Sequence, residues 1–384
     1  MNYWKLRYMT PKARKVVARN LSRLREQLRS TIPHQTVDQS LVLGTWNIRN
    51  FDDNRFGHGR RLDESLFYIG EVLSAFDVLA IQEITTDLEG FDRLQDVVGY
   101  DYKYILTDAT EGRSGNNERL AFAYNRSKVS FKELAGEIVL PQNLLISSKN
   151  NKLQFSRTPF CCQFQSSWFK FMFATVHIYY GSGSKQTKAY QRRVDEIEKI
   201  ARFLRKRADT EGINYVLVGD FNIDKPANDD EAFNALQKAG FSVFLNREGS
   251  NKRKNKYYDQ ISFRSKAGEV ELATESVGEL DPHGVFDVFQ SVFRDEDFDA
   301  YDEAVRSSLK ERIKAAKAEL STTNAVKRKA RLTKTIESLS EILRLKKNRE
   351  QYYLNEWRTF QISDHLPLWV TLKIDFTDRY LESI

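Results

Sequence analysis

The stretch Ile362-Ser363-Asp364-His365-Leu366-Pro367-Leu368-Trp369-Val370-Thr371-Leu372 places an acid and an imidazole at the start of an apolar strand. Upstream, three other apolar runs end in a polar side chain: one at Asn47, one at Glu83 and one at Asp220, within Val216-Leu217-Val218-Gly219-Asp220-Phe221-Asn222. In parallel and mixed sheets, the strand ends are where side chains leave the core and where chemistry is placed. The repetition predicts that these strands bring their polar ends to one edge.

The residue types at these strand ends are amides, carboxylates and an imidazole. Carboxylate and amide oxygens are the ligands that a hard cation such as Mg²⁺ prefers. A bound cation can polarise a phosphoryl group, and an imidazole with an ordinary pKa of about 6.5 can move protons near neutrality. The pattern therefore indicates a metal-dependent phosphoesterase.

Composition limits the alternatives. The 384 residues, 41% of them hydrophobic, suffice for one large α/β domain with additions or for two small domains.

The two cysteines, Cys161 and Cys162, are adjacent and would point to opposite faces of a strand, so we expect no disulfide and a reducing compartment. There is no zinc-ligand spacing, no apolar run of transmembrane length and no secretory signal after Met1, so the expected location is cytoplasmic, with no membrane partner.

The net charge of +7 is unevenly distributed. Residues 1–38 contain nine Lys/Arg and two Asp/Glu, and residues 302–358 contain fifteen Lys/Arg and eight Asp/Glu, so each segment carries +7 and the remainder carries −7. We therefore predict three parts: a basic N-terminal helical arm (1–38), a catalytic domain (39–301 and 359–384) and an inserted basic helical hairpin (302–358). An acidic body suits a carboxylate-rich metal site, and basic appendages suit a polyanion.

Both appendages have helical periodicity. In residues 11–30, an apolar stripe runs among arginines, and it is compatible with a helix docked on the body or with a free nucleic-acid arm. In the hairpin, the two stripes are Val305, Leu309, Ile313, Ala316 and Leu320, and then Leu332, Ile336, Leu339 and Leu343. Residues 321–324 are the expected break. The hairpin either clamps DNA or buries its second stripe against a second copy or a partner protein.

Within the body, short apolar strands alternate irregularly with helices. The predicted strands are 41–46, 78–81, 120–124, 159–163, 169–177, 215–219 and 259–263, and the predicted body helices cover 62–73 and 190–205. Strands outnumber helices, which favours two sheets with helices outside. The expected fold is a four-layer α/β/β/α sandwich with an inserted helical hairpin and a basic N-terminal helix.

Eight segments occur in an order that resembles the endonuclease/exonuclease/phosphatase superfamily, and within it the pancreatic-type deoxyribonuclease branch. They are Trp46-Asn47-Ile48-Arg49-Asn50-Phe51, Ile81-Gln82-Glu83-Ile84, Asn117-Glu118-Arg119-Leu120-Ala121-Phe122, Phe155-Ser156-Arg157-Thr158-Pro159, Val176-His177, Gly219-Asp220-Phe221-Asn222, Tyr258-Asp259-Gln260-Ile261 and Ser363-Asp364-His365-Leu366-Pro367. The resemblance covers residues 41–263 and 360–373. It departs from the family pattern in the 105 positions between Asp259 and Asp364, most of which the hairpin occupies, and in the lack of the disulfides of the secreted branch.

The resemblance implies a magnesium site, with Mn²⁺ as an alternative, formed by Asn47 and Glu83. Asp364 is placed on the metal or phosphate side. Ordinary capping of strand ends is the structural alternative for Asn47 and Glu83.

The resemblance also implies two histidine–carboxylate pairs, His365 with Asp259 and His177 with Glu118. A carboxylate partner fixes the tautomer of an imidazole and raises its basicity. His34, His58 and His283 lie outside the motifs and are assigned no role.

By the same resemblance, Asp220 orients or deprotonates the attacking water and Asn222 donates a hydrogen bond to the phosphoryl oxygen. An Asx turn after the strand is the alternative for this pair. Arg157 and Arg119 are candidates to contact substrate phosphate, because a guanidinium binds phosphate bidentately. A surface ion pair is the alternative for both arginines, and a nearly equal one for Arg119.

Together these features predict a magnesium-dependent phosphodiesterase, specifically an endonuclease that hydrolyses DNA with little sequence specificity. The predicted contacts go to phosphate, which carries no sequence information. Two alternatives stay open: a phosphatase acting on a small or lipid phosphate ester, and a non-catalytic scaffold that binds nucleic acid or a protein partner, including a second copy, through 302–358.

Overall fold

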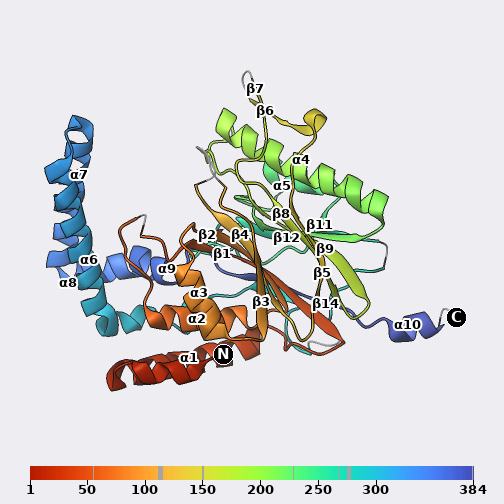
Figure 1. Cartoon of the computed structure of the whole chain (residues 1–384), viewed down its shortest axis with the longest axis horizontal. Helices are drawn as coiled ribbons and strands as arrows, with labels where there is room; N and C mark the ends of the chain where they lie inside the picture. The colour runs from red at the N-terminus through yellow and green to blue at the C-terminus, as the bar shows by residue number, and fades with distance from the viewer. Residues whose placement is uncertain are drawn as a thin grey trace.

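The computed structural model describes residues 1–54, 56–110, 116–148, 151–227, 229–266, 268–274, 278–382 and 384. Two six-stranded sheets pack face to face (Figure 1). In spatial order, the first sheet contains β13 (His283–Val285), β14 (Leu368–Lys373), β1 (Ser40–Phe51), β2 (Val78–Ile84), β4 (Arg119–Asn125) and β3 (Tyr102–Leu106). The second contains β11 (Ser242–Val243), β12 (Asp259–Arg264), β10 (Asn214–Asp220), β9 (Phe169–His177), β8 (Phe160–Ser166) and β5 (Ser130–Glu137).

Helices cover the outer face of each sheet (Figure 1). On the first sheet these are α2 (Asp63–Leu73) and α3 (Glu89–Val98), and on the second they are α4 (Lys188–Glu211) and α5 (Glu231–Lys238). The remaining short elements are η2 (Gln142–Leu144), η3 (Val288–Gln290), η4 (Asp295–Asp297), α10 (Thr377–Glu382) and the strand pair β6 (Ile146–Ser148) and β7 (Asn151–Leu153). No helix in the described part of the chain is both long and apolar enough to span a membrane.

The central strands read as continuous apolar runs because both of their faces are buried. In β1, Leu41 and Leu43 pack between the sheets, whereas Val42 and Trp46 pack under the helices. The adjacent free cysteines of β8 obey the same alternation. The result is one apolar layer between the sheets and one under each set of helices, so the predicted four-layer α/β/β/α sandwich is confirmed.

The topology brings the polar strand ends together. β1 runs parallel to β2, and β9 runs parallel to β10, so the carboxyl ends of each pair lie at one edge. β14 and β12 run antiparallel to β1 and β10, so their amino ends lie at that same edge. The register pairs Asp220 with His177 on one side and with Asp259 on the other.

Two of these strand ends are irregular. β1 continues beyond the expected end at Trp46 to Phe51, with a shift in register after Asn47. Arg49 and Asn50 within this bulge have φ values of 43° and 42°, and Glu83 at the end of β2 has a φ of 64°. Non-glycine residues adopt such left-handed conformations at a cost, which is typically met at functional sites.

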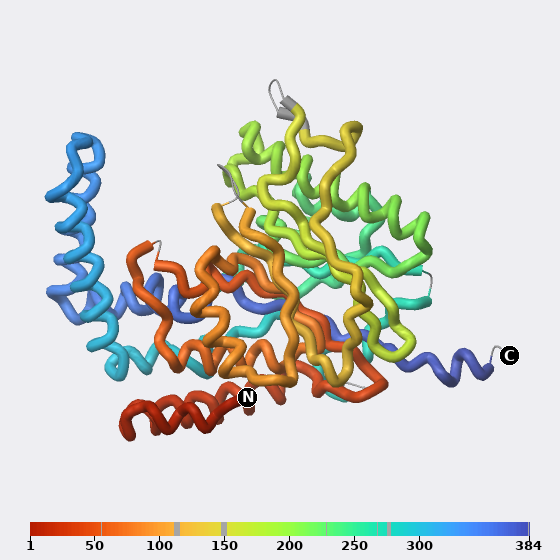
Figure 2. Tube along the Cα trace, viewed as in Figure 1, coloured from red at the N-terminus to blue at the C-terminus, as the bar shows by residue number. Residues whose placement is uncertain are grey.

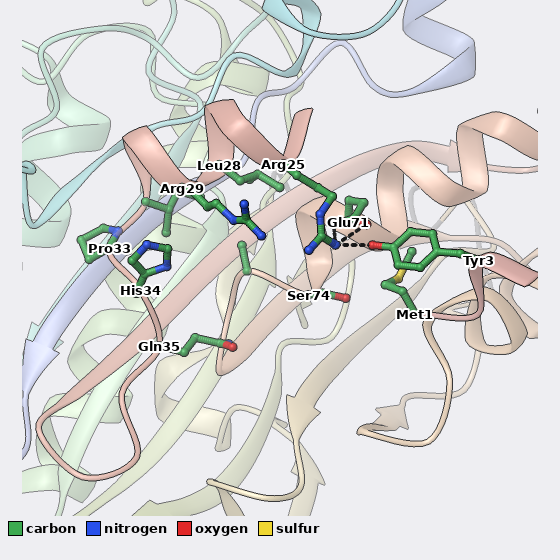
Figure 3. Close-up of a pocket in the computed structure, with 12 residues that line it drawn as sticks. Met1, Tyr3, Arg25, Leu28, Arg29, Pro33, His34, Gln35, Glu71 and Ser74 are labelled. Carbon is green, nitrogen blue, oxygen red and sulfur yellow. Dashed lines mark hydrogen bonds and ion pairs between the residues drawn. The ribbon is translucent and has the colours of Figure 1, made fainter. Parts of the chain in front are cut away.

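The basic N-terminal helix α1 (Pro11–Thr31) is docked on the body. Its buried stripe is Val17, Leu21, Leu24 and Leu28, which belong to the same core as the helix-covered face of the first sheet. Arg25 of α1 pairs with Glu71 of α2 at 3.2 Å and contacts the hydroxyl of Tyr3 in η1 (Tyr3–Tyr8), as Figure 3 shows. Of the two interpretations left open by the sequence, the docked helix is the one observed.

The basic insertion contains two long helices that lie side by side and stand away from the sheets (Figure 2). They are α6 (Phe298–Thr322) and α7 (Val326–Arg344), and the chain returns to the body through α8 (Lys346–Tyr352), a π-helical turn (Tyr353–Trp357) and α9 (Arg358–Gln361). Leu332 and Leu339 of α7 are buried, with Ile336 and Leu343 partly buried beside them. The stripe of α7 is therefore largely covered within this chain, without a second copy.

Candidate active site

Six polar side chains from both sheets meet at this common edge. They are Asn47 on β1, Glu83 on β2, His177 at the end of β9, Asp220 at the end of β10, Asp259 at the start of β12 and His365 just before β14. All except Glu83 are buried.

His365 and Asp259 form a hydrogen-bonded pair. Nδ1 of His365 lies 2.8 Å from Oδ2 of Asp259, which also accepts a bond of 2.6 Å from Oγ of Ser250. Because Nδ1 faces Asp259, Nε2 is the atom presented to the site, 3.8 Å from Oδ2 of Asp220. Burial opposes protonation of this imidazole, but the carboxylates of Asp259 and Asp220 outweigh it and raise the pKa of His365 well above its ordinary value.

His177 faces a carboxylate on the opposite side, at ion-pair distance but without the hydrogen-bond geometry of the His365 pair. Its Nδ1 lies 2.9 Å from Oε2 of Glu118, and its Nε2 lies 3.5 Å from Oδ2 of Asp220. Burial works against ionisation of Glu118, but His177 and Arg157 together lower the pKa of this carboxyl to about 2. Burial and Arg157 act to lower the pKa of His177. The carboxylates of Glu118 and Asp220 act to raise it and outweigh them, so the pKa of His177 is raised above its ordinary value.

Asp220 is the centre of the arrangement. Its Oδ2 faces Nε2 of both imidazoles, while its Oδ1 accepts the backbone N–H of Asn222 at 2.9 Å. Burial raises the pKa of Asp220, against the opposing effect of the two histidines. The Asx turn is therefore present, and it leaves one carboxylate oxygen directed into the site.

Asn47 links Glu83 to this centre. Its Nδ2 donates to Oε1 of Glu83 at 2.7 Å and to Oδ2 of Asp220 at 3.1 Å. The other oxygen of Glu83 accepts the backbone N–H of Asn50 at 2.8 Å and its side-chain amide at 3.0 Å. Carboxylate oxygens from both sheets thus converge on the amide of one residue.

The described residues contain two groups that suit a divalent cation. One comprises Glu83, His177 and Asp220, the other Asp220, Asp259 and His365, and in each group the potential ligand atoms lie within 4.8 Å of one another. In addition, Oδ1 of Asp259 is buried without a hydrogen-bond partner. Three carboxylates in this small region fit an oxygen-ligated cation, because such an ion would offset their mutual repulsion.

The family described as "Endonuclease/Exonuclease/phosphatase family" matches residues 44–268, more than half of the chain. This chain belongs to the endonuclease/exonuclease/phosphatase family. It is thus a member of a family of phosphoester hydrolases, and the recognition made from the eight segments is confirmed at this level. No curated protein matches the sequence.

Solved structures of the same fold include an endonuclease/exonuclease/phosphatase family protein from Bacteroides thetaiotaomicron, with a TM-score of 0.50 and 16% identity over 89% of this chain and 97% of that one. A mannosyl-6-phosphatase from the same organism is 18% identical over 64% of this chain and 90% of that one, with a TM-score of 0.46. The catalytic domain of human Nocturnin is 15% identical over 63% of this chain and 91% of that one, also with a TM-score of 0.46. At 16% identity, the similarity to the first of these structures concerns the fold alone.

Two predicted site residues, Asp364 and Arg157, form contacts with other side chains of this chain. Asp364 has a side chain 45% exposed, lies outside both potential metal groups in the described chain and faces Arg49, with Oδ1 to Nε at 3.6 Å. Arg157 is buried, and its Nε donates to Glu118 at 2.6 Å. Asp364 thus lies at the rim, and Arg157 contacts Glu118, while the metal or phosphate role of Asp364 and the phosphate role of Arg157 stay predictions.

Arg119, at the start of β4, contacts the loop that follows the neighbouring strand β3. Its Nη1 donates to the carbonyl oxygen of Thr107 at 2.8 Å and to Asp108 at 3.0 Å. This is the ion-pair alternative that the sequence left open. The side-chain amide of Asn222 donates to the carbonyl oxygen of Ile178 at 2.9 Å, which leaves one N–H of that amide for a substrate.

Several supporting residues lie outside the motifs that the sequence analysis used. Ser250 positions Asp259, as described above. Arg193 of α4 is fully buried and donates to the carbonyl oxygens of Asn222 at 2.8 Å and of Ser182 at 2.8 Å, so it secures the loop after β10. In the sequence, Arg193 looks like any other arginine of a helical segment. Its role becomes visible only from the residues that surround it in the structure.

Glu83→Gln should raise the magnesium concentration needed for activity while leaving a recoverable maximal rate. The substitution keeps the size of the side chain but removes one anionic oxygen from the potential metal group, so the affinity for Mg²⁺ falls. The measurement is calorimetric titration of Mg²⁺ together with the rate across a magnesium series. The matched control is Glu89→Gln, an exposed carboxylate at the start of α3. Equal magnesium affinity in the Glu83 variant and the wild type would contradict this role.

Proposed function

We propose that this chain is a divalent-metal-dependent phosphodiesterase that hydrolyses the DNA backbone with little sequence preference. The observation that carries the proposal is the convergence of two carboxylate-supported imidazoles on a single oxygen, Oδ2 of Asp220. Two imidazoles beside one buried carboxylate can act as general acids and bases, which transfer protons during reaction at a phosphoryl centre.

In this proposal, Asp220 holds the attacking water and accepts its proton as the water oxygen bonds to phosphorus. Burial supports this role, since it raises the pKa of Asp220 and makes the carboxylate a better base than an exposed one. Asn47 keeps the carboxylate of Asp220 in place through its 3.1 Å bond to Oδ2.

The two histidines act as imidazolium groups. His365 presents its Nε2–H to the reacting phosphate, where it stabilises the developing charge or gives its proton to the leaving oxygen as the phosphorus–oxygen bond breaks. His177 presents its Nε2–H from the other side. Asp259 and Glu118 keep both rings charged and oriented, which is consistent with the raised pKa of each imidazole.

A divalent cation held by oxygens of Glu83 and Asp220, with Asn47 beside them, would supply polarisation of the phosphoryl group. Magnesium suits these hard oxygen ligands, and manganese is an alternative with similar preferences.

Two features favour DNA as the substrate. The groups in the site are suited to phosphate rather than to a base, which fits cleavage without sequence preference. The two basic segments, 1–38 and 302–358, each carry +7 beside a body of −7, so a polyanion is attracted to the appendages.

The test is an assay on supercoiled plasmid DNA, on a small chromogenic phosphodiester and on a phosphate monoester, each with magnesium and with a chelator. Asp220→Asn serves as the inactive control, with its fold checked by circular dichroism. We expect nicking of the plasmid and hydrolysis of the small diester, both abolished by the chelator. Hydrolysis of the monoester alone would instead identify a phosphatase, and activity that survives chelation would contradict the metal requirement.

A further inference from the structure

The tip of the α6–α7 hairpin, defined here as residues 310–334, is a concentrated cationic surface. It contains nine Lys/Arg and only two Asp/Glu. The seven exposed cations for which no ion pair is found in the described chain are Lys310, Lys314, Lys317, Lys327, Lys329, Arg331 and Lys334.

The root of the same hairpin is organised differently, because its charges are neutralised internally. Arg349 forms a two-pronged bond with Asp302, with distances of 2.6 and 2.9 Å, and Arg306 joins the same carboxylate at 3.0 Å. Lys346 pairs with Asp299 at 2.6 Å. The unbalanced charge is thus confined to the tip.

This charge is arranged unfavourably for an isolated hairpin. Lys310, Lys314 and Lys317 follow one another at steps of four and three on α6, and Lys327, Arg331 and Lys334 do so on α7. Residues at these steps are neighbours on a helix, and like charges there repel one another. A bound polyanion would relieve this repulsion, since residues 310–334 supply only two acids, Glu311 and Glu319.

An apolar partner suits the tip poorly. The apolar stripes of α6 and α7 are already buried within this chain, as shown by the burial of Ile313, Ala316, Leu332 and Leu339. Among large hydrophobic side chains of the described α6–α7 hairpin, only Val326 is strongly exposed. A single valine cannot form the hydrophobic centre that a protein interface of this kind requires.

The helix α9, through which the chain returns from the hairpin to the body, reaches the rim of the active site. Arg49, two residues beyond Asn47, donates from its guanidinium to Oγ1 of Thr359 and stacks 3.7 Å over the ring of Phe360, both on α9. Arg61 secures the same junction by bonds to the carbonyl oxygens of Ile48 and Gln361. The hairpin is therefore attached beside the catalytic edge rather than at a remote part of the body.

We propose that the hairpin tip binds the sugar–phosphate backbone of duplex DNA and holds it beside the catalytic edge. This inference rests on the proposed function and names the surface that retains its substrate. The duplex is favoured because its closely spaced phosphates match two stripes of exposed cations on a rigid support, and each contact releases counterions.

The test compares two fourfold variants. The tip variant is K317Q/K327Q/R331Q/K334Q, and the matched control removes four exposed lysines of the body, K103Q/K132Q/K170Q/K238Q. Removal of the whole insertion is unsuitable, because Val305, Tyr353 and Trp357 belong to the core. Binding to a short DNA duplex is measured by fluorescence anisotropy over a salt series, with a chelator present to prevent cleavage.

We expect the tip variant to bind more weakly and to have a shallower slope of log affinity against log salt, by up to about 3.6 units if all four cations contact phosphate. The control should keep the wild-type slope. An unchanged slope in the tip variant, an equal loss in both variants, or binding to anionic lipid vesicles that exceeds binding to DNA would each overturn the proposal.

Hydrolysis of the small chromogenic phosphodiester separates this inference from the proposed function. The tip variant should retain the wild-type rate on that substrate, because its substitutions lie away from the catalytic side chains. If the wild type hydrolyses the small diester but the salt slope does not depend on the tip, only the inference fails. If no phosphodiester is hydrolysed by the wild type while the tip still controls DNA affinity, the proposed function fails and the binding surface stands.

Discussion

His365→Ala should lower the turnover number for a phosphodiester by about two to four orders of magnitude, the range expected for the loss of a general acid or base. The imidazole presents Nε2 to the reacting group, and Asp259 holds it in that orientation through a bond of 2.8 Å. Alanine removes this donor and leaves the carboxylate of Asp259 with its bond to Ser250 as the remaining side-chain hydrogen bond in the described part of the chain. The Michaelis constant should change much less than the turnover number, because the interaction develops mainly in the transition state.

The measurement is steady-state kinetics on the small chromogenic diester, with the fold of the variant verified by thermal melting. His34→Ala is the matched control, since His34 is exposed and remote from the six converging side chains. A folded His365→Ala protein that turned over at the wild-type rate would remove His365 from the mechanism.

Gly219→Ala should destabilise the protein by about 3 to 5 kcal/mol, which is at the upper end for a single substitution. Gly219 has a φ of +129°, and a Cβ atom there would lie 2.1 Å from the carbonyl oxygen of Val176 on the neighbouring strand. β10 is bonded to β9 and β12 on its two sides and is buried, so neither the clash nor the backbone strain can be relieved cheaply. Since Asp220 follows directly, activity should be lost together with stability.

Urea unfolding followed by circular dichroism measures this effect as a shift of the midpoint. Gly136→Ala is the control, because Gly136 lies on the exposed strand β5, where an added Cβ meets no atom within 4 Å. The control should unfold at the wild-type concentration of urea. Coincident unfolding curves for Gly219→Ala and the wild type would show that the strand can accommodate a side chain, contrary to this account.

The order and nature of the strands were predictable from the sequence for a local reason. Runs such as Val216–Gly219 are apolar on both faces, and this is the pattern that burial between two layers imposes. Their polar ends were equally visible, because a charged or amide side chain directly after such a run must lie where the strand leaves the core. The sandwich and the family followed from these local patterns, taken in their order along the chain.

The partners of the individual side chains were decided only by the tertiary structure. Arg157 turns to Glu118, and Asp364 faces Arg49 at the rim, because each takes the nearest opposite charge supplied by a distant segment. Similarly, the basic helix α1 became part of the body because its apolar stripe met the first core layer. Periodicity in a sequence shows that a helix has an apolar face, but the surface that this face covers depends on how separate elements pack in space.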